Sequence, residues 1–202
     1  MTLAPGTDRI ESDRLVLRRI TPDDGNFFAR IHAMPEVRRY LGDGRPYSAE
    51  DSRAWIERML VTYQSSNLGQ LAVVRKSDGQ LIGRCGLSDL VVENAAPGTI
   101  PRGWLRRGQA PAGVELIDVP DLGYTFDPAN WGHGFATEAA RCVFDYARAS
   151  LRWPRIVSVI HPDNARSLRV AQRLGLRRDG QVAINSSRTT ATLEQYVWPV
   201  RL

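Results

Sequence analysis

Two glycines ahead of a run of helix formers are the part of this sequence best suited to bind a ligand. In NWGHGFATEA, which covers residues 130–139, Gly132 and Gly134 flank a histidine, and the helix formers begin at Phe135. Glycines clear side chains from the space before a helix N-terminus, where unpaired N–H groups and a partial positive charge favour phosphate. Glycines also suit a tight turn that needs a positive φ. The residues alone leave both interpretations open.

The two cysteines, Cys85 and Cys142, lie far apart in the sequence. Two such thiols make no disulfide framework, and neither belongs to a cluster with the spacing of metal ligands. We therefore expect two reduced thiols in a cytoplasmic protein, and no metal site.

Length and charge narrow the classes of protein further. A chain of 202 residues favours a single domain over 1–202, here with an N-terminal tail over 1–10. The 27 Lys and Arg against 22 Asp and Glu give a net charge of +5, which suits an anionic ligand but lacks the dense basic stripe of a nucleic-acid binder. No apolar stretch approaches the ~18 residues that span a bilayer, and MTLAPGTDRI does not resemble a secretory signal. We expect no membrane partner and no direct nucleic-acid partner.

Hydrophobic periodicity, caps and turn residues predict alternating strands and helices. In chain order we expect a strand over 14–20, a helix over about 21–34, a helix capped by Ser48 and Asp51, a hairpin over 70–87, a long loop or a loosely paired flap over 93–113, a strand over 114–126 with Pro120 at a bulge or edge, a helix from Phe135, a strand over 155–160, a short helix between Asn164 and Gly175, and strands near 181–185 and 193–198. The helix from Phe135 has a continuous apolar face at positions 136, 139, 140, 143, 144 and 147.

Two longer motifs resemble a known family. DLGYTFDPANWGHGFATEAARCVFDYA and HPDNARSLRVAQRLGLRRDG resemble the acetyl-CoA-binding motifs of the GNAT superfamily of N-acyltransferases. The resemblance is strongest to the branch of ribosomal-protein N-terminal acetyltransferases, and it covers about residues 11–202. It implies an α/β (α+β) GNAT fold, with helices on both faces of a mixed central sheet. That sheet is splayed between its fourth and fifth strands, which correspond to Asp121–Phe126 and Arg155–Ile160.

The same resemblance implies acetyl-CoA as the acyl donor. The pantetheine arm would pair with strand backbone at the splay, and the glycine loop would hold the pyrophosphate. The residues that it assigns to acetyl-CoA are Tyr124, Thr125, Phe126, Trp131, Gly132, His133, Gly134, Phe135, Ala136, Thr137, Asn164 and Ser167. His133 stands where many members have Lys or Arg, and it is equally typical of an exposed, neutral loop histidine. Asn164 also suits a helix N-cap, which is compatible with the assigned role.

Two residues are candidates for catalysis. Ala171 stands where many members carry a tyrosine that protonates the leaving thiolate, and the resemblance makes Ser167 the substitute. A serine at a helix start also commonly bonds backbone. Asp121 stands where the family often has a glutamate, so it is a candidate base acting through water, with Glu115 as the alternative. It is equally typical of an acid at a strand entry with no catalytic duty.

The chemistry of amines indicates the acceptor. Only a neutral amine attacks a thioester, and an α-amine with a pKa near ~8 is roughly one-tenth neutral at pH 7, whereas a lysine near ~10.4 is neutral in only a few parts in ~10,000. We therefore expect an N-acetyltransferase acting on a primary amine, above all a protein or peptide N-terminal α-amine. A small-molecule amine, or a non-catalytic module that binds acyl-CoA, is the alternative.

The acceptor site has weaker signals. The aromatic residues Phe27, Phe28, Tyr40, Tyr47 and Trp55 are candidates for its wall, but their spacing is also that of core residues. In the 93–113 loop, Trp104 is flanked by Arg102, Arg106 and Arg107. That cluster would suit an acidic acceptor, a solvated excursion or the subunit contact of a homodimer.

Overall fold

The computed structural model describes residues 9–65, 69–105, 107–151, 155–185 and 190–197. The chain forms two compact units. Unit 1 comprises Met1–Leu87 and Gly123–Arg152, and unit 2 comprises Ser88–Leu122 and Trp153–Leu202. Strand β8, Asp121–Phe126, gives its first two residues to unit 2 and the others to unit 1. The expectation of a single acyltransferase domain stays a prediction.

The strands of unit 1 follow the order β1-β2-β3-β4-β8. The first four are β1 (Arg9–Glu11), β2 (Leu15–Arg19), β3 (Gly69–Arg75) and β4 (Leu81–Ser88), each antiparallel to the next. The predicted hairpin is therefore confirmed, and Gly79 in its turn has a φ of 69°. Because β1 begins at Arg9, the expected tail over 1–10 ends in a strand.

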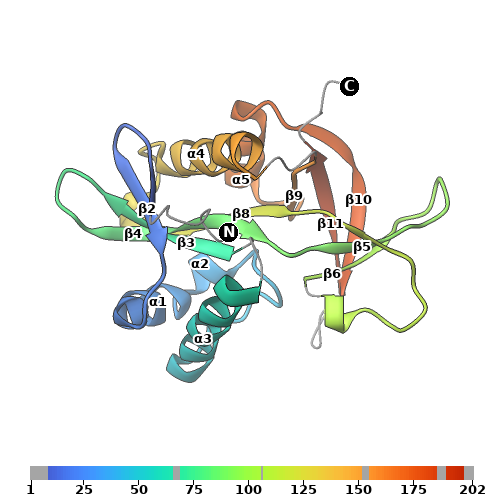
Figure 1. Ribbon diagram of the computed structural model, residues 1–202, viewed down its shortest axis with the longest axis horizontal. Coiled ribbons are helices and arrows are strands. Elements are labelled where there is room, and N and C mark those ends of the chain that lie inside the picture. The colour runs from blue at the N-terminus through green and yellow to red at the C-terminus, as the bar shows by residue number, and fades with distance from the viewer. Residues whose placement is uncertain (1–8, 66–68, 106, 152–154, 186–189, 198–202) are drawn as a thin grey trace. The chain divides into compact units, whose positions relative to one another are not determined.

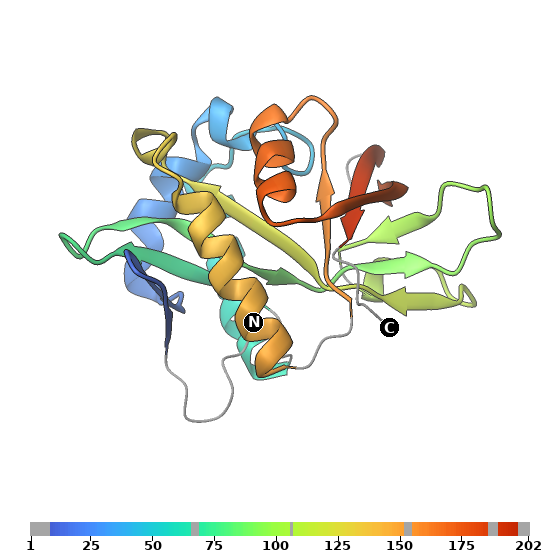
Figure 2. The ribbon, with the colours of Figure 1, turned by 90° about the horizontal axis from the view of Figure 1, so that it is seen from above.

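The helices of unit 1 cover both faces of its strands. They are η1 (Pro22–Asp24), α1 (Gly25–His32), α2 (Pro35–Arg38), α3 (Ala49–Ser65), η3 (Pro128–Asn130) and α4 (Phe135–Ala149). Figure 1 shows α1 and α3 on one face and α4 on the other, and Figure 2 shows α4 lying across the strands from above. The helix predicted over 21–34 is instead a 3-10 turn followed by α1. The proline of Met34-Pro35 starts the separate helix α2, because proline suits a first helical position.

The structure confirms the predicted start of α3 and the predicted apolar face of α4. Ser48 and Asp51 form the expected capping box, since Asp51 N–H donates to the Ser48 hydroxyl and Ser48 N–H donates to the Asp51 carboxylate, both at 3.0 Å. In α4 the predicted apolar face is buried at Ala139, Ala140, Val143, Phe144 and Ala147, whereas Ala136 at the helix start is half-buried.

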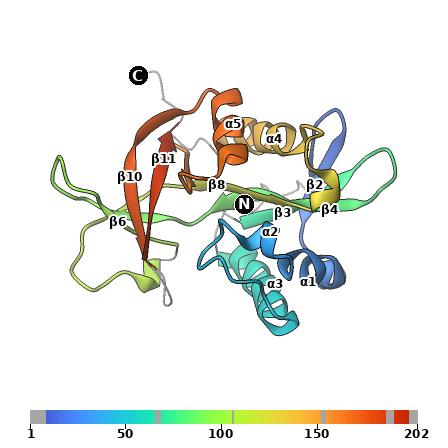
Figure 3. The ribbon, with the colours of Figure 1, turned by 180° about the vertical axis from the view of Figure 1, so that it is seen from behind.

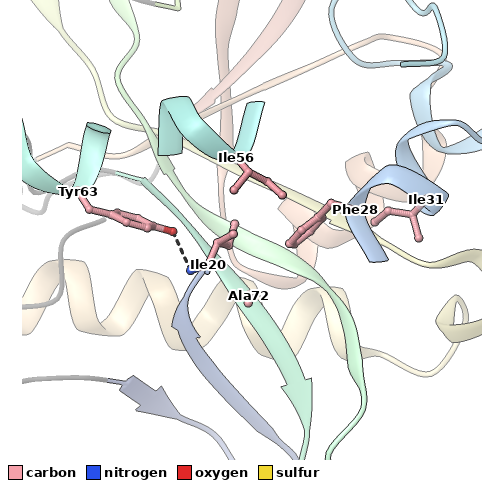
Figure 4. Close-up of a cluster of buried hydrophobic side chains, with 6 residues drawn as sticks. All are labelled: Ile20, Phe28, Ile31, Ile56, Tyr63 and Ala72. Carbon is pink, nitrogen blue, oxygen red and sulfur yellow. Dashed lines mark hydrogen bonds between the residues drawn. The ribbon is translucent and has the colours of Figure 1, made fainter. Parts of the chain in front are cut away.

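A hydrophobic core packs between the strands of unit 1 and the helices α1 and α3. Its buried members are Ile20, Phe28, Ile31, Ile56, Tyr63 and Ala72 (Figure 4). The Tyr63 hydroxyl accepts a hydrogen bond from Ile20 N–H at 3.1 Å and donates one to the carbonyl of Gln70. Burial raises the pKa of Tyr63 to about 12, so the phenol stays neutral and satisfied inside the core.

Unit 2 is a mixed sheet in the order β8-β9-β11-β10-β6-β5-β7. Its further elements are β5 (Val91–Glu93), β6 (Arg102–Trp104), η2 (Arg107–Gln109), β7 (Leu116–Asp118), β9 (Val157–Ile160), α5 (Ala165–Arg173), β10 (Arg177–Asn185) and β11 (Thr190–Val197). The pairs β8/β9 and β10/β6 are parallel and the others antiparallel. Figure 3 shows β10 and β11 side by side.

The structure refines two expectations for residues 93–126. The segment over 114–126 is two strands, β7 and β8, because Pro120 between them cannot donate to a ladder. The segment over 93–113, expected as a long loop or a loosely paired flap, contains β6, which pairs with β10. Gly103 of β6 lies so close to β10 that a Cβ there would be 2.9 Å from the side chains of Val182 and Ile184. Trp198, the expected end of the last strand, lies outside the described residues. Among the described helices, none is long and apolar enough to cross a bilayer.

Candidate active site

The glycine loop of unit 1 leads into α4 without a side-chain cap. Gly132 and Gly134 have φ values of 84° and 81°, and Gly134 is the N-cap residue of α4. Glycine is required at both positions for backbone reasons, as the tight-turn interpretation predicted. Among the described residues the N-cap makes no side-chain cap hydrogen bond. A Cβ on Gly132 would meet nothing within 4 Å, and one on Gly134 would lie 3.5 Å from Nη2 of Arg14. A helix start that is not capped by a side chain is suited to bind phosphate.

Side chains from other elements of unit 1 hold the segment before this loop. Asp127 is buried, and its carboxylate accepts from Ala129 N–H at 3.1 Å and from the Arg30 guanidinium at 2.6 Å. The indole N–H of Trp131 turns back and donates to the carbonyl of Phe126 at 2.9 Å. Trp131 therefore fixes the loop through its side chain, whatever its backbone binds.

Arg14 clamps the loop to α4. Its Nε and Nη2 lie 2.7 and 2.6 Å from the Glu138 carboxylate, and its Nη1 donates to the carbonyl of His133 at 3.2 Å. The guanidinium also lies 4.7 Å from the ring centre of Phe135. Ser12 completes the clamp by donating to Glu138 at 2.7 Å.

The ionisation of Glu138 fits this arrangement. Partial burial raises the pKa of its carboxyl, but the hydrogen bonds from Ser12 and Arg14 outweigh burial and lower the pKa overall. The carboxylate is thus charged at neutral pH, and it neutralises Arg14 behind the loop. No local pattern predicts this clamp, because Arg14 and Glu138 are 124 residues apart.

His133 is exposed and packs on its own loop. Its Nδ1 lies 2.9 Å from the carbonyl of Trp131, and its ring stacks on Phe135 with 5.8 Å between ring centres. A carbonyl only accepts, so Nδ1 carries the proton in this contact.

The remaining assigned residues of unit 1 lie on β8. Thr125 and Phe126 are buried and Tyr124 is half-buried. A Cβ on Gly83 of β4 would be 2.5 Å from the carbonyl of Thr125, so the two strands approach closely and only glycine fits. This close packing fixes the backbone that the resemblance assigns to the pantetheine arm.

In unit 2, Asn164 and Ser167 lie together at the start of α5. The Asn164 side chain accepts from Ser167 N–H at 3.2 Å, so Asn164 is the N-cap that the sequence predicted. Ser167 takes part through its backbone, and among the described residues its half-buried hydroxyl has no hydrogen-bond partner. The alternative that this hydroxyl serves the helix backbone is therefore not what the structure shows. Ala171, one turn further, is buried.

Asp121 lies where β8 and β9 meet, also in unit 2. It is 9% exposed, and its Oδ1 accepts from Val159 N–H at 3.0 Å. On the neighbouring residue of each strand, the Ser158 hydroxyl donates to the carbonyl of Leu122 at 3.0 Å. Asp121 is therefore engaged with the backbone of β9.

The aromatic candidates for an acceptor wall are largely core. Phe28 is fully buried, and Phe27 and Trp55 pack against the same cluster. The rings of Phe28, Tyr47 and Trp55 contact His32, a residue that sequence reasoning missed. Its Nδ1 lies 3.1 Å from the Ser52 hydroxyl. Burial, with the charges of two arginines, lowers the pKa of His32 to about 3, so it is neutral at physiological pH.

The basic cluster of the 93–113 segment is partly neutralised. Arg102 pairs with Glu93 at 2.7 Å and lies 5.6 Å from the ring centre of Trp104, which is buried. Arg106 lies outside the described residues. Trp104 is thus a packing residue of unit 2.

The family is shown by sequence comparison. The profile described as acetyltransferase (GNAT) domain matches residues 14–177. The chain belongs to the GNAT acetyltransferase family and is an N-acetyltransferase. Acetyltransferases of this family use acetyl-CoA.

Individual relatives agree with this assignment. The uncharacterized N-acetyltransferase YoaA of Bacillus subtilis (strain 168) is 28% identical over 171 residues, covering 85% of this chain and 84% of the relative. The crystal structure of a GNAT-family acetyltransferase from Bacillus anthracis has a TM-score of 0.69 at 19% identity, covering 94% of this chain and 97% of that one. RimL, described as a ribosomal L7/L12 alpha-N-protein acetyltransferase in complex with coenzyme A, has a TM-score of 0.68 at 15% identity, covering 95% and 98%. These likenesses confirm the predicted GNAT fold.

Proposed function

We propose that this enzyme transfers an acetyl group from acetyl-CoA to the α-amine of a protein or peptide N-terminus. The observation that carries the proposal is the start of α4, where helix N–H groups with no side-chain cap lie beside two exposed glycines in a clamped loop. The backbone of Trp131–Thr137 would hold the pyrophosphate there, and Tyr124–Phe126 on β8 would pair with the amide-like pantetheine arm.

The protein's own residues then have to supply only the proton transfers of the reaction. Bound acetyl-CoA brings the acetyl thioester, and in the reaction the acetyl group passes from sulfur to nitrogen while the amine loses a proton and the thiolate gains one. Ser167 is the proposed donor of that proton, since its hydroxyl has no other hydrogen bond among the described residues. Of the candidate bases we propose Glu115 or water, since the Asp121 carboxylate accepts from Val159 N–H.

Two arguments favour an α-amine over a lysine. An enzyme with a weak base depends on the neutral fraction of its acceptor, which is far larger for α-amines at pH 7. RimL, similar in fold, is described as an alpha-N-protein acetyltransferase, which is consistent with the ribosomal-protein branch that the sequence motifs resemble.

The proposed compartment is the cytoplasm. Cys85 and Cys142 are both free, and burial raises the pKa of each thiol, most at Cys85, so neither is a reactive thiolate. A homodimer, and the absence of a metal or nucleic-acid partner, remain predictions.

The test is thiol release from acetyl-CoA with matched peptides. One peptide has a free N-terminus and no lysine, the second has a blocked N-terminus and one lysine, and small amines form a third arm. We expect turnover with the first peptide at least tenfold above the second. Turnover confined to small amines would contradict the proposed acceptor, and acetyl-CoA binding without turnover in every arm would indicate a binding module.

A further inference from the structure

The parallel ladder between β8 and β9 stops after one register pair, and two side chains take over where it stops. Asp121 pairs with Val157, and Val157 N–H donates to the carbonyl of Pro120 at 2.9 Å. In a regular parallel ladder the next bond on this side would run from Val159 N–H to the carbonyl of Leu122.

That bond is replaced at both ends. Val159 N–H donates instead to the Asp121 carboxylate, and the carbonyl of Leu122 accepts instead from the Ser158 hydroxyl, each at 3.0 Å. Every group in this exchange is satisfied and belongs to unit 2. We call the two side-chain contacts the β8–β9 clasp. A buried N–H and a buried carbonyl that pair with side chains have no need to pair with each other.

We propose that Asp121 and Ser158 are positioning residues that end the β8–β9 ladder and so prevent further backbone hydrogen bonds between these two strands. The inference rests on the proposed acetyl-CoA site, in which an amide-like pantetheine arm pairs with the backbone of β8. A continuing ladder would use the backbone groups that this arm needs. Asp121 acts through the strand backbone, and the role of base passes to Glu115 or water.

The substitution Asp121→Asn separates this role from base catalysis. Asparagine retains a side-chain oxygen that accepts from Val159 N–H, but it cannot take a proton at neutral pH. We expect the dissociation constant for acetyl-CoA and kcat to stay within about threefold of the parent enzyme, because the hydrogen bond persists with a neutral acceptor. The pH profile of kcat should keep its shape. A fall in kcat of about 100-fold, the range of lost general-base catalysis, would overturn the inference.

The substitution Asp121→Ala removes the acceptor. We expect acetyl-CoA affinity to fall about tenfold, as for a lost hydrogen bond to a charged group, with a smaller effect on kcat. Asp118→Ala, which removes an exposed carboxylate from the preceding strand, is the matched control and should leave affinity unchanged. Unchanged affinity in folded Asp121→Ala would contradict the proposal. Should that variant not fold, Ser158→Ala provides the same test with a loss of about threefold.

The double variant Asp121→Ala/Ser158→Ala should give a result that is not expected if the two side chains only stabilise the fold. With both side chains removed, Val159 N–H and the carbonyl of Leu122 can bond directly and extend the ladder. We expect the double variant to be less destabilised than the sum of the single variants, while its acetyl-CoA affinity stays as low as that of Asp121→Ala. Additive destabilisation would overturn the inference.

Amide hydrogen exchange separates the inference from the proposed function. The Val159 amide should be protected in the parent protein and in Asp121→Asn, and this holds even if acetyl-CoA does not bind. Failure of acetyl-CoA binding in the parent would therefore refute the proposed site alone. Rapid exchange of the Val159 amide in the parent would refute the clasp.

Discussion

The helices α4 and α5 each begin a few residues after a strand, but they satisfy their first N–H groups in different ways. At α5, the Asn164 side chain takes the capping bond, which leaves the hydroxyl of Ser167 without a helix partner among the described residues. At α4, the N-cap is left-handed Gly134, and no side chain caps the first turn. One helix start thus offers a side-chain hydroxyl and the other offers backbone N–H groups, so the proposed proton donor and the proposed anion site belong to the same kind of element.

The contacts that hold the first turns of α4 and α5 also differ. The α4 turn is held by Arg14 and Glu138, which the chain brings together across 124 residues. The α5 turn is held by a residue three positions away. We therefore expect changes at α4 to alter acetyl-CoA affinity, and changes at α5 to alter turnover or local stability.

The largest expected effect is at Ser167. Ser167→Ala should lower kcat by about 10- to 100-fold, because a leaving thiolate with a pKa near ~8.5 loses its donor and water substitutes in part. Acetyl-CoA affinity should change little, and Ser167→Thr, which keeps a hydroxyl, should restore most of kcat. Steady-state kinetics beside a direct titration checks both. Undiminished turnover in Ser167→Ala would show that the hydroxyl takes no part in the reaction.

A new charge at the start of α4 should have the next largest effect. Gly132 and Gly134 need positive φ, so substituting them strains the backbone whether or not phosphate binds. Ala136→Glu is a cleaner probe, because an acid in the first turn favours the helix but repels a pyrophosphate. We expect acetyl-CoA to bind about tenfold more weakly, since charges ~10 Å apart at an effective dielectric of ~20 interact by about 1.7 kcal/mol.

The matched control is Ala49→Glu, the same change at the exposed first residue of α3. It should leave affinity unchanged, and both variants should keep the thermal stability of the parent. Equal losses of acetyl-CoA affinity in the two variants would mean that only net charge matters, and would contradict the proposed pyrophosphate site at the start of α4.

The clamp behind the α4 loop should have a smaller effect. Glu138→Gln keeps the size of the side chain but removes the charge that neutralises Arg14, so we expect a loss in acetyl-CoA affinity of about three- to fivefold through a looser loop. Arg14→Lys should lose a similar amount, because lysine cannot make the bidentate contact. Arg9→Lys, on the neighbouring strand and outside the clamp, should behave like the parent in calorimetry. An Arg14→Lys variant that binds as tightly as the parent would show that the clamp does not position the loop.

The smallest expected effect is at the α5 cap. Asn164→Ala should lower the free energy of unfolding by about 1 kcal/mol, the usual cost of an N-cap. Asn164→Asp, which also caps, should recover it, and Asp163→Ala should be neutral because Asp163 is exposed. Chemical denaturation checks the three variants. If Asn164→Ala is neutral, the cap seen in the structure adds no stability.

Local patterns predicted most elements of this fold. The face of α4, the hairpin β3–β4 and the α5 cap all follow from residues close in sequence, and Gly175 ends α5 with a φ of 76° as expected. The short strands β1, β5 and β6 were missed, because three residues give no readable periodicity. Of the two alternatives for 93–113, a long loop or a loosely paired flap, the structure shows pairing at β6, where the ladder with β10 overrides the local turn composition.

The candidate site likewise has parts that follow from local sequence and parts that do not. The glycine loop and the Asn164 cap could be predicted, since they depend on neighbours in sequence. The Arg14–Glu138 clamp and the β8–β9 clasp could not be predicted from the sequence, because their partners meet only in the folded chain. Asp121 stands where the resemblance suggested a base, and the structure adds a bond from the Val159 backbone that no local pattern predicted.

The most direct test compares kcat at saturating acetyl-CoA in Ser167→Ala and Ala136→Glu, with the same N-terminal peptide as acceptor. The division between the two helix starts predicts that kcat falls about 10- to 100-fold in Ser167→Ala and stays within about twofold of the parent in Ala136→Glu. Equal kcat losses in the two variants, or a larger loss in Ala136→Glu, would contradict that division.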